Sequence, residues 1–161
     1  MSTSQRNEPF EEPPREQIPV RTREHIAAME ASDADEIWFV AGMHHLMLCT
    51  VGRRSGERQK AALPYWLDAD GHPIVVASYA GSPKHPAWYL NLGDREKNPE
   101  VLVRTQREAY WARARDLDGD DYRKTWDALV VDRPFYVDYQ SRTTRKLPLI
   151  RLVKQRPAPA S

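Results

Sequence analysis

The sequence has little cysteine, no long hydrophobic run and almost no net charge. Its single cysteine, Cys49, cannot form an intramolecular disulfide, which fits a reducing compartment. No apolar stretch approaches the roughly 20 residues of a membrane-spanning helix, and the polar N-terminal stretch lacks the apolar core of a signal peptide. A formal net charge of +1 argues against a nucleic-acid-binding protein. These absences predict a cytoplasmic protein with no transmembrane segment and no nucleic-acid partner.

Composition divides the 161-residue chain into one folded unit and two tails. Residues 1–21 combine prolines, glutamates and arginines with few large apolar side chains, and the C-terminal stretch RPAPAS has a similar character. Such segments bury too little apolar surface to stay folded. We therefore predict flexible tails at 1–21 and 155–161 around one domain at 22–154, which is long enough for a single hydrophobic core.

Short apolar runs and alternating patterns, separated by turn residues, predict about six strands and three or four helices. The expected strands are 45–51, 58–68, 73–78, 100–106, 107–117 and 147–153, and the expected helices are 22–31, a second one capped by Ser32 and Asp35 that ends near Gly42, 87–96 and 120–131. The stretch 133–145 is expected to be a loop. Short connections favour antiparallel pairing, and Pro64 favours an edge or a bulge. The predicted fold class is α+β, a small antiparallel barrel with peripheral helices.

The stretch VGRRSGERQK, residues 51–60, concentrates positive charge in a turn. Arg53, Arg54, Arg58 and Lys60 lie within eight residues. A turn requires glycine or serine but not four cations. The charge is therefore either a solvated surface or a local site for an acidic ligand, and the solvated surface is the favoured interpretation of the stretch taken alone.

Five segments, in order, resemble the deazaflavin (coenzyme F420)-dependent nitroreductases and F420H2-dependent quinone reductases. They are TVGRRSG (50–56), LPYWLDADG (63–71), VVASYAGSPKHPAWYLNL (75–92), NPEV (98–101) and DYQSRTTRKLPLI (138–150). Together they cover most of residues 45–152. The resemblance implies a split β-barrel and hydride transfer from reduced deazaflavin to an electrophilic acceptor such as a quinone or a nitroaromatic, with no FMN.

The resemblance also gives the basic turn a ligand, because coenzyme F420 is an 8-hydroxy-5-deazaflavin with a phosphate and a polyglutamate tail, and arginine binds phosphate in a bidentate way. The implied cofactor-binding residues are Arg53, Arg54, Ser55, Lys60, Ala61, Ala62, Leu63, Pro64 and Tyr65 around the turn, Val76, Ala77, Ser78 and Tyr79 beside the ring, and Ala87, Trp88, Tyr89 and Asn91 on the following helix. Arg58 and Lys84 are further candidates that rest on charge alone.

On the acceptor side, the resemblance implies that tyrosines before the last strand form the wall of the substrate pocket. Tyr136, Tyr139 and Ser78 are the candidate catalytic residues, because a hydroxyl donor stabilises the oxyanion that hydride transfer leaves on a quinone. Packing of the two tyrosines onto the barrel is the alternative, and for Tyr139 the two readings carry equal weight. Arg133 stands where some relatives have an aromatic residue.

The chain departs from the family pattern at two further places. Relatives commonly have proline followed by leucine and tyrosine after the basic turn, whereas this chain reads Leu63, Pro64, Tyr65, with one additional residue between Gly56 and Lys60. Many relatives have two glycines where this chain has alanine and glycine at 80–81. These differences predict tail contacts shifted by one residue and an altered loop beside the ring.

Other functions remain open at this level. An FMN-binding split-barrel oxidoreductase has the same fold class, and a non-catalytic F420-binding or carrier protein would need the same binding residues. The histidines His44, His45 and His85 have no carboxylate or cysteine partner at ligand spacing, so no metal site is expected. The resemblance is also compatible with a homodimer, and the N-terminal tail with peripheral contact at the inner face of the membrane.

Overall fold

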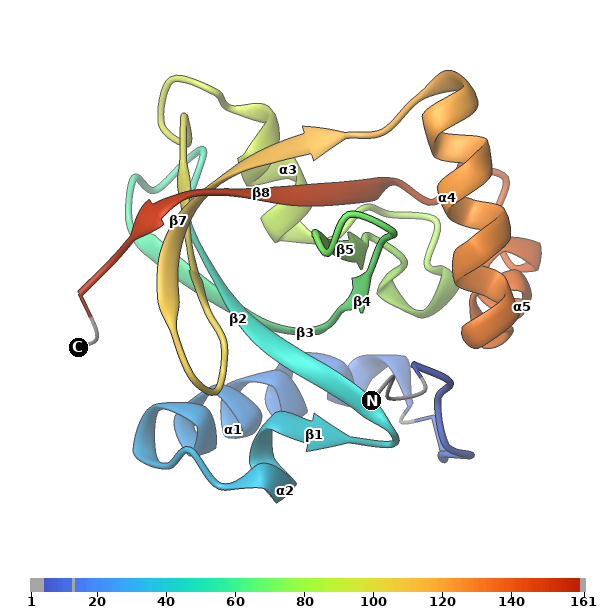
Figure 1. The fold of residues 1–161 in the computed structure, drawn as a ribbon, viewed down its shortest axis with the longest axis horizontal. Coiled ribbons are helices and arrows are strands. Elements are labelled where there is room, and N and C mark those ends of the chain that lie inside the picture. The colour runs from blue at the N-terminus through green and yellow to red at the C-terminus, as the bar shows by residue number, and fades with distance from the viewer. Residues whose placement is uncertain (1–4, 13, 160–161) are drawn as a thin grey trace.

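The structure is a computed structural model that describes residues 5–12 and 14–159. Eight strands and a small set of helices alternate along these residues (Figure 1). The strands are β1 (Phe39–Val40), β2 (Met43–Val51), β3 (Arg58–Pro64), β4 (Trp66–Leu67), β5 (Pro73–Val76), β6 (Val101–Arg104), β7 (Ala109–Asp116) and β8 (Leu149–Pro157). The α-helices are α1 (Ile18–Ala31), α2 (Asp35–Trp38), α3 (Ala87–Gly93), α4 (Gly119–Asp132) and α5 (Phe135–Ser141), and the 3-10 helices are η1 (Arg15–Gln17) and η2 (Tyr79–Gly81).

All strand pairs are antiparallel, in the order β1-β2-β6-β7-β8-β5-β4, with β3 also paired to β2. The strands β3 and β4 lie at opposite ends of this hydrogen-bonded order, yet only Tyr65 separates them in the chain. A flat sheet cannot satisfy both conditions, so the sheet curls until its two ends approach each other (Figure 1). The predicted α+β split barrel is confirmed.

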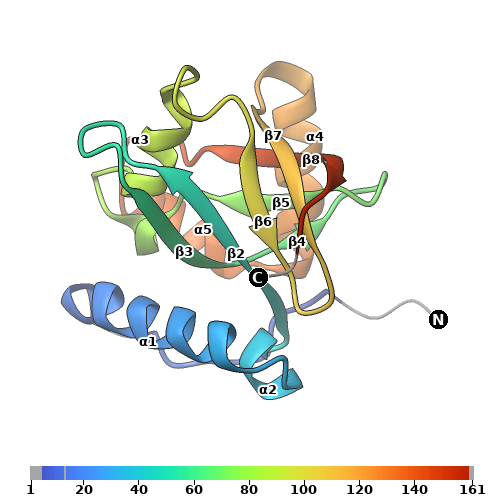
Figure 2. The ribbon, with the colours of Figure 1, turned by 90° about the vertical axis from the view of Figure 1, so that its left-hand side faces the viewer.

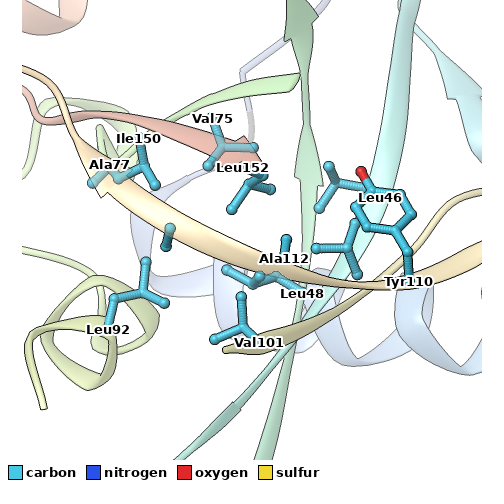
Figure 3. Close-up of a cluster of buried hydrophobic side chains, with 12 residues drawn as sticks. Leu46, Leu48, Val75, Ala77, Leu92, Val101, Tyr110, Ala112, Ile150 and Leu152 are labelled. Atoms are coloured by element: carbon cyan, nitrogen blue, oxygen red, sulfur yellow. The ribbon is translucent and has the colours of Figure 1, made fainter. Parts of the chain in front are cut away.

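The barrel interior holds the main apolar core. Inward-facing side chains alternate along the strands, as Val101 and Val103 do on β6 and Tyr110, Ala112 and Ala114 do on β7. Figure 3 shows side chains from several strands and from α3 directed toward one another. Because burial of each aliphatic side chain contributes about 1.5–3 kcal/mol, this core holds the strands that form the walls of the site.

Helices cover two parts of the barrel surface. Helix α1 runs alongside β3 (Figure 2) and buries Ile26 and Met29 against Trp38, Met47 and Cys49. Helices α4 and α5 form a second cluster at the far end of the barrel (Figure 1). Within the described residues, no helix is long and apolar enough to cross a membrane.

Several local predictions were wrong. The stretch predicted as an aromatic loop forms helix α5, because Phe135, Tyr136 and Tyr139, which lie on one side of a helix, pack into the same cluster as α4. Helix α1 begins at Ile18 rather than at residue 22. The predicted second helix is one turn long, and its N-cap is Ala34, with no capping by the Ser32 hydroxyl. The chain then turns through Ala41 and Gly42, both with positive φ, and pairs β1 with β2.

The sheet also differs from the predicted six strands. The expected strand at 58–68 is divided into β3 and β4 at Tyr65, and β3 is an edge strand, as Pro64 indicated. Strand β8 continues to Pro157, because its pairing with β7 extends through Tyr110. On the N-terminal side, the segment before α1 contacts the domain, because Glu8 N–H donates to the Ala41 carbonyl at 2.6 Å. The prediction placed the ends of the domain at 22–154, while the regular structure runs further in both directions.

Candidate active site

A cavity of about 810 Å³ opens between α1, the β2–β3 hairpin, α3 and α5. This volume is in the range of cofactor and small-molecule sites. One end lies at the basic turn, where Arg53 and Lys60 contribute to the lining, and the other end is lined by Phe135, Tyr136 and Tyr139. The cavity therefore joins a cationic end to an aromatic end, which is the polarity of a ligand with an acidic tail and a planar head.

Asn91 of α3 holds the basic turn in place. Its side-chain oxygen accepts from the backbone N–H of Arg53 at 3.1 Å and from the Arg53 guanidinium at 3.3 Å, while its amide donates to Thr50 Oγ1 and Gln59 Oε1. Asn91 is 1% exposed. A buried amide with its donors and acceptor all engaged is a rigid anchor, so the turn has a fixed shape.

Asn98 makes a second connection to the same turn. Its side chain accepts from Val51 N–H at 2.7 Å and donates to the Val51 and Asn91 carbonyls at 2.9 Å. The neighbouring ammonium of Lys97 donates to the Arg53 carbonyl at 2.7 Å. The segments HPAWYLNL and NPEV, far from the turn in sequence, thus position its cations.

The cations of the turn differ in how far they are already paired. Lys60 forms an ion pair with Glu30 of α1 at 2.7 Å. Within the described residues, Arg54 and Arg58 have no carboxylate partner, and both side chains are exposed. The two arginines are available to an anion, while Lys60 has to exchange one carboxylate for another.

At the aromatic end of the cavity, called the ring end below, the chain leaves β5 in an unusual backbone conformation. Ser78 is right-handed helical, with φ −84° and ψ −38°, and Tyr79, Ala80 and Gly81 follow with φ of +43°, +53° and +78°. A right-handed residue followed by a left-handed one turns successive N–H groups toward one concave face, which favours a negative ligand atom. The methyl of Ala80 does not prevent this conformation, although a left-handed non-glycine residue is strained by about 1–2 kcal/mol.

Arg145 fixes this backbone from behind. Its guanidinium donates to the carbonyls of Ala77 at 2.9 Å, Ser78 at 2.8 Å and Ser82 at 2.8 Å, and one of the same nitrogens contacts His85 Nδ1 at 3.2 Å. The Gly81 and Ser82 N–H groups donate to the Ser78 and Tyr79 carbonyls within the turn. The N–H groups of Ser78, Tyr79 and Ala80 have no such partner among the described residues, and these are the ones that can face a ligand. Partial burial lowers the pKa of Arg145, and the pKa of His85 falls through its own burial and the neighbouring guanidinium.

Helix α5 brings the two predicted tyrosines to the aromatic end. Tyr136 is 3% exposed and Tyr139 is 9% exposed, and their rings lie 6.1 Å apart, nearly perpendicular. Burial raises the pKa of each phenol to about 12, so both carry their proton at neutral pH. Phe10 packs edge-on against Phe135 at 5.2 Å and covers this end from the N-terminal segment.

The predicted site residues divide into two groups. Those that line the cavity are Arg53, Lys60, Ala61, Ala62, Leu63, Pro64, Val76, Ser78, Tyr79, Ala87, Trp88, Tyr136 and Tyr139. Those that do not are Arg54, Ser55, Tyr65, Ala77, Tyr89 and Asn91. Of the two candidates chosen on charge, Lys84 lines the cavity and Arg58 does not.

The residues outside the cavity act on it indirectly or face elsewhere. Ala77 packs in the core and Asn91 holds the turn. The Ser55 hydroxyl accepts from Glu57 N–H within the turn at 3.1 Å. The Tyr89 hydroxyl donates to Asp116 at 2.7 Å, away from the cavity, and Tyr65 lines a different depression beside Tyr110.

Sequence reasoning missed three contributors. Arg145 lies within a matching segment but was read as part of a loop. Thr50 and Gln59 line the cavity beside Asn91, and no residue-type signal separates them from ordinary strand residues. Helix α1, with Thr22 and His25 among the lining residues, begins before the first matching segment.

A model of the F420H(2)-dependent quinone reductase family matches residues 21–154. The chain belongs to this family. Membership makes the protein an F420-dependent oxidoreductase, with coenzyme F420 as the hydride donor.

Individual relatives agree with the family match. The chain is 30% identical over 113 residues to the F420H(2)-dependent quinone reductase Rv1261c of Mycobacterium tuberculosis strain H37Rv, covering 68% of this chain and 73% of that protein. A solved structure of an F420-H2 dependent reductase, FDR-A, superimposes with a TM-score of 0.56 at 31% identity and covers 67% of this chain and 92% of its own. A second solved structure, a domain-swapped dimer, gives a TM-score of 0.58 at 28% identity over 81% of this chain and 95% of its own.

The residues present fit a deazaflavin coenzyme. The exposed arginines of the turn suit the phosphate and the acidic tail, and the concave N–H groups at Ser78–Ala80 suit the carbonyl edge of a ring that becomes negative on reduction. Arg53 of the turn lines the same cavity as Ser78, Tyr79 and Ala80, and the exposed Arg54 and Arg58 belong to the turn at its cationic end.

Proposed function

We propose that the protein reduces a quinone, and that the two ends of the cavity divide the work between coenzyme binding and acceptor activation. The observation that carries this proposal is the combination, in one cavity, of the basic turn, the left-handed backbone at Ser78–Gly81 and the protonated phenol of Tyr136. A nitroaromatic is the second acceptor class, since its reduction also leaves negative charge on oxygen.

In this proposal Arg53 and Arg54 bind the phosphate and tail, and Lys60 joins them after leaving Glu30. Ser55 and Asn91 keep the turn in its binding shape, and Ala61, Ala62, Leu63 and Pro64 form the floor along β3. Val76, Ser78 and Tyr79 present backbone donors to the ring, with Ala87 and Trp88 packed against it. Ala77, whose N–H donates to the Pro148 carbonyl at 3.0 Å, holds the end of this strand in the core. Tyr65 and Tyr89, whose hydroxyls lie away from the cavity, have at most a packing role.

The bound coenzyme supplies a hydride from carbon C5 of its ring. The chain orients the acceptor against the ring, excludes water with Phe10, Phe135 and Leu63, and provides a proton at Tyr136 Oη. Tyr139 and Ser78 are secondary donors toward the same oxyanion. General acid catalysis of this kind contributes about 10²–10⁴-fold, so Tyr136 is the residue whose loss reduces the rate most.

Assembly and location belong to the same proposal. Likeness to a domain-swapped dimer favours a homodimer, and the absence of a membrane-spanning helix among the described residues is compatible with a cytoplasmic protein. Peripheral contact of the N-terminal segment with a membrane would bring the cavity to a lipid quinone, and co-sedimentation with anionic vesicles tests it.

The first test is fluorescence titration of the purified protein with oxidised F420, in parallel with FMN. We expect micromolar or tighter F420 binding that an Arg54→Ala, Lys60→Ala double variant weakens by about 10-fold or more, since each lost charged contact contributes about 1.5–3 kcal/mol. Arg113→Ala, which removes an exposed arginine on β7, is the matched control. FMN binding in place of F420 would contradict the coenzyme assignment.

Turnover then separates an enzyme from a carrier. Reduced F420 is mixed with menadione or with a nitroaromatic, and oxidation is followed by absorbance. Tight F420 binding without oxidation of the coenzyme by either acceptor would leave a carrier and refute the catalytic assignment.

A further inference from the structure

Arg133 is a buried cation close to Tyr136, which lines the aromatic end of the cavity. It lies between α4 and α5 and is 2% exposed, among the most buried large side chains in the protein. Its Nε donates to the Gln5 carbonyl at 3.0 Å, and its backbone N–H donates to the Leu129 carbonyl at 2.8 Å. The first contact holds the guanidinium and the second holds the backbone at Arg133, and neither neutralises the charge.

No carboxylate of the described residues forms an ion pair with this guanidinium. The adjacent Asp132 accepts instead from Trp66 Nε1 at 2.7 Å. An unpaired buried charge is costly, and burial accordingly lowers the pKa of Arg133. A cation retained at this cost needs a partner, and besides the charge of the adjacent Asp132 its surroundings offer a hydroxyl.

That hydroxyl belongs to Tyr136, three residues further along the chain. The Tyr136 N–H donates to the Arg133 carbonyl at 3.2 Å, so the two residues share one helical turn, and both side chains are buried there. The guanidinium interacts with the Tyr136 hydroxyl. A guanidinium has only donors, so the phenolic oxygen accepts from Arg133 and its own O–H remains for another acceptor. Tyr136 also lines the coenzyme cavity, where the acceptor oxygen is expected.

We propose that Arg133 is a positioning residue for proton transfer, which directs the O–H of Tyr136 into the cavity and stabilises the phenolate that remains when the proton has left. The inference rests on the proposed function, in which Tyr136 is the proton donor. The guanidinium does not touch the quinone, and it acts through the tyrosine.

The step balances as follows. The quinone gains two electrons and one hydrogen nucleus as a hydride from reduced F420, and it then carries one negative charge on oxygen. That oxygen takes the proton of Tyr136 Oη, which becomes a phenolate next to the Arg133 guanidinium. Water returns a proton to the phenolate. F420 is oxidised and releases its second hydrogen to the solvent as a proton, which replaces the proton taken from water, and the quinone is reduced to the hydroquinone.

A purely structural role is the alternative, since Arg133 also holds Gln5 and so the N-terminal segment. The two roles differ in one respect. A structural anchor acts on folding and coenzyme affinity whatever stands at 136, whereas a positioning residue has no effect on turnover once the tyrosine hydroxyl is absent.

The experiment is a double-mutant cycle on kcat with reduced F420 and menadione. It compares the wild type with Arg133→Met, Tyr136→Phe and the double variant, and Arg107→Met, an exposed arginine of the β6–β7 connection, is the control. We expect about a 100-fold or greater fall in kcat for Tyr136→Phe and about a 10-fold fall for Arg133→Met with KM and the F420 Kd unchanged. The double variant is expected to match Tyr136→Phe alone.

The outcomes are distinguishable. An unchanged kcat in Tyr136→Phe would refute the proton-donor role and with it this inference. A fall in Tyr136→Phe, with a second independent fall in the double variant, would leave the proposed function standing and overturn the inference alone. If Arg133→Met does not fold, Arg133→Lys replaces it. Lysine keeps the charge, so we expect kcat within about 3-fold of the wild type and a larger solvent deuterium isotope effect, whereas a smaller or absent isotope effect overturns the inference.

Discussion

The two ends of the cavity use arginine in opposite ways. At the basic turn, Arg54 and Arg58 are exposed and have no carboxylate partner among the described residues. At the ring end, the Arg145 guanidinium donates to three backbone carbonyls. The first group is available to a ligand, while the second is committed to the fold.

Solvent decides this difference. An exposed guanidinium is stabilised by water and can exchange water for a phosphate at little cost, whereas a partly buried one such as that of Arg145 has lost part of its water and needs protein acceptors before any ligand arrives. A cluster of arginines therefore identifies a candidate site. The degree of burial shows whether each arginine binds the ligand itself or holds the backbone that binds it.

Removal of Arg145 should destabilise the backbone turn that it holds at the ring end. Arg145→Met leaves the carbonyls of Ala77, Ser78 and Ser82 without their donor, and we expect a loss of about 3 kcal/mol in the free energy of unfolding, since hydrogen bonds to a charged group contribute about 1.5–3 kcal/mol each and water replaces part of them. F420 affinity should fall by more than that of an Arg53→Ala variant. Urea unfolding and F420 titration measure both, with Arg107→Met as control. Equal losses of F420 affinity in Arg145→Met and Arg53→Ala would contradict the difference between the two ends of the cavity.

The burial of His45 predicts that the free energy of unfolding depends on pH. His45 lines the cavity and donates from Nδ1 to the Met43 carbonyl at 2.9 Å, and burial lowers its pKa from 6.5 to about 4. The unfolded imidazole binds a proton below about pH 6.5, while the folded one stays neutral. Stability is therefore lost as the pH falls from 6.5 to about 4, by about 3 kcal/mol in total.

Urea unfolding at several pH values, for the wild type and for His45→Phe, measures this contribution. The variant should lose less stability between pH 7 and pH 4 than the wild type does. Parallel pH profiles for the two proteins would contradict the expectation.

The left-handed backbone at the ring end can be tested with two substitutions of opposite sign. In Gly81→Ala the new Cβ would lie 2.7 Å from the Tyr139 carbonyl oxygen at φ +78°, and we expect about 2 kcal/mol of destabilisation. Ala80→Gly relieves a left-handed alanine and should stabilise by about 0.5–1 kcal/mol, after the larger chain entropy of glycine is subtracted. Thermal unfolding of both variants gives the comparison, and the same sign for both would show that the turn is not held in this conformation.

The smallest effect is expected at the basic turn, where the coenzyme tail is proposed to bind. Glu30→Gln frees Lys60 from a half-exposed ion pair, so the free energy of unfolding should change by less than about 0.5 kcal/mol. F420 binding should tighten about 2-fold at low salt and return to the wild-type value near 1 M salt, where charges are screened. Glu108→Gln, which breaks a similarly exposed pair with Lys154, is the control. An equal gain in that control would show that the effect comes from net charge alone.

Local sequence patterns predicted most of the strands of the barrel. The alternation at Tyr110, Ala112 and Ala114 predicted β7 and its buried face, and Pro64 predicted an edge strand. Helix α5 was missed because a seven-residue helix with prolines and aromatics nearby has no clear period, and its helical form depends on packing against α4. Strand β8 extends to Pro157 because β7 offers it a partner, which composition does not reveal.

The site shows the same division. The sequence by itself determined that cations cluster at Arg53–Lys60, that small residues follow β5 and that aromatics precede β8, since these are properties of neighbouring residues. Only the tertiary structure decided which of these side chains meet. Arg145 reaches Ala77 and Ser78 across 68 and 67 positions of the chain, respectively, and Asn91 reaches Arg53 across 38. Contacts at such separations form only when the sheet curls and buries its core, so the free energy that assembles this site is that of the whole barrel.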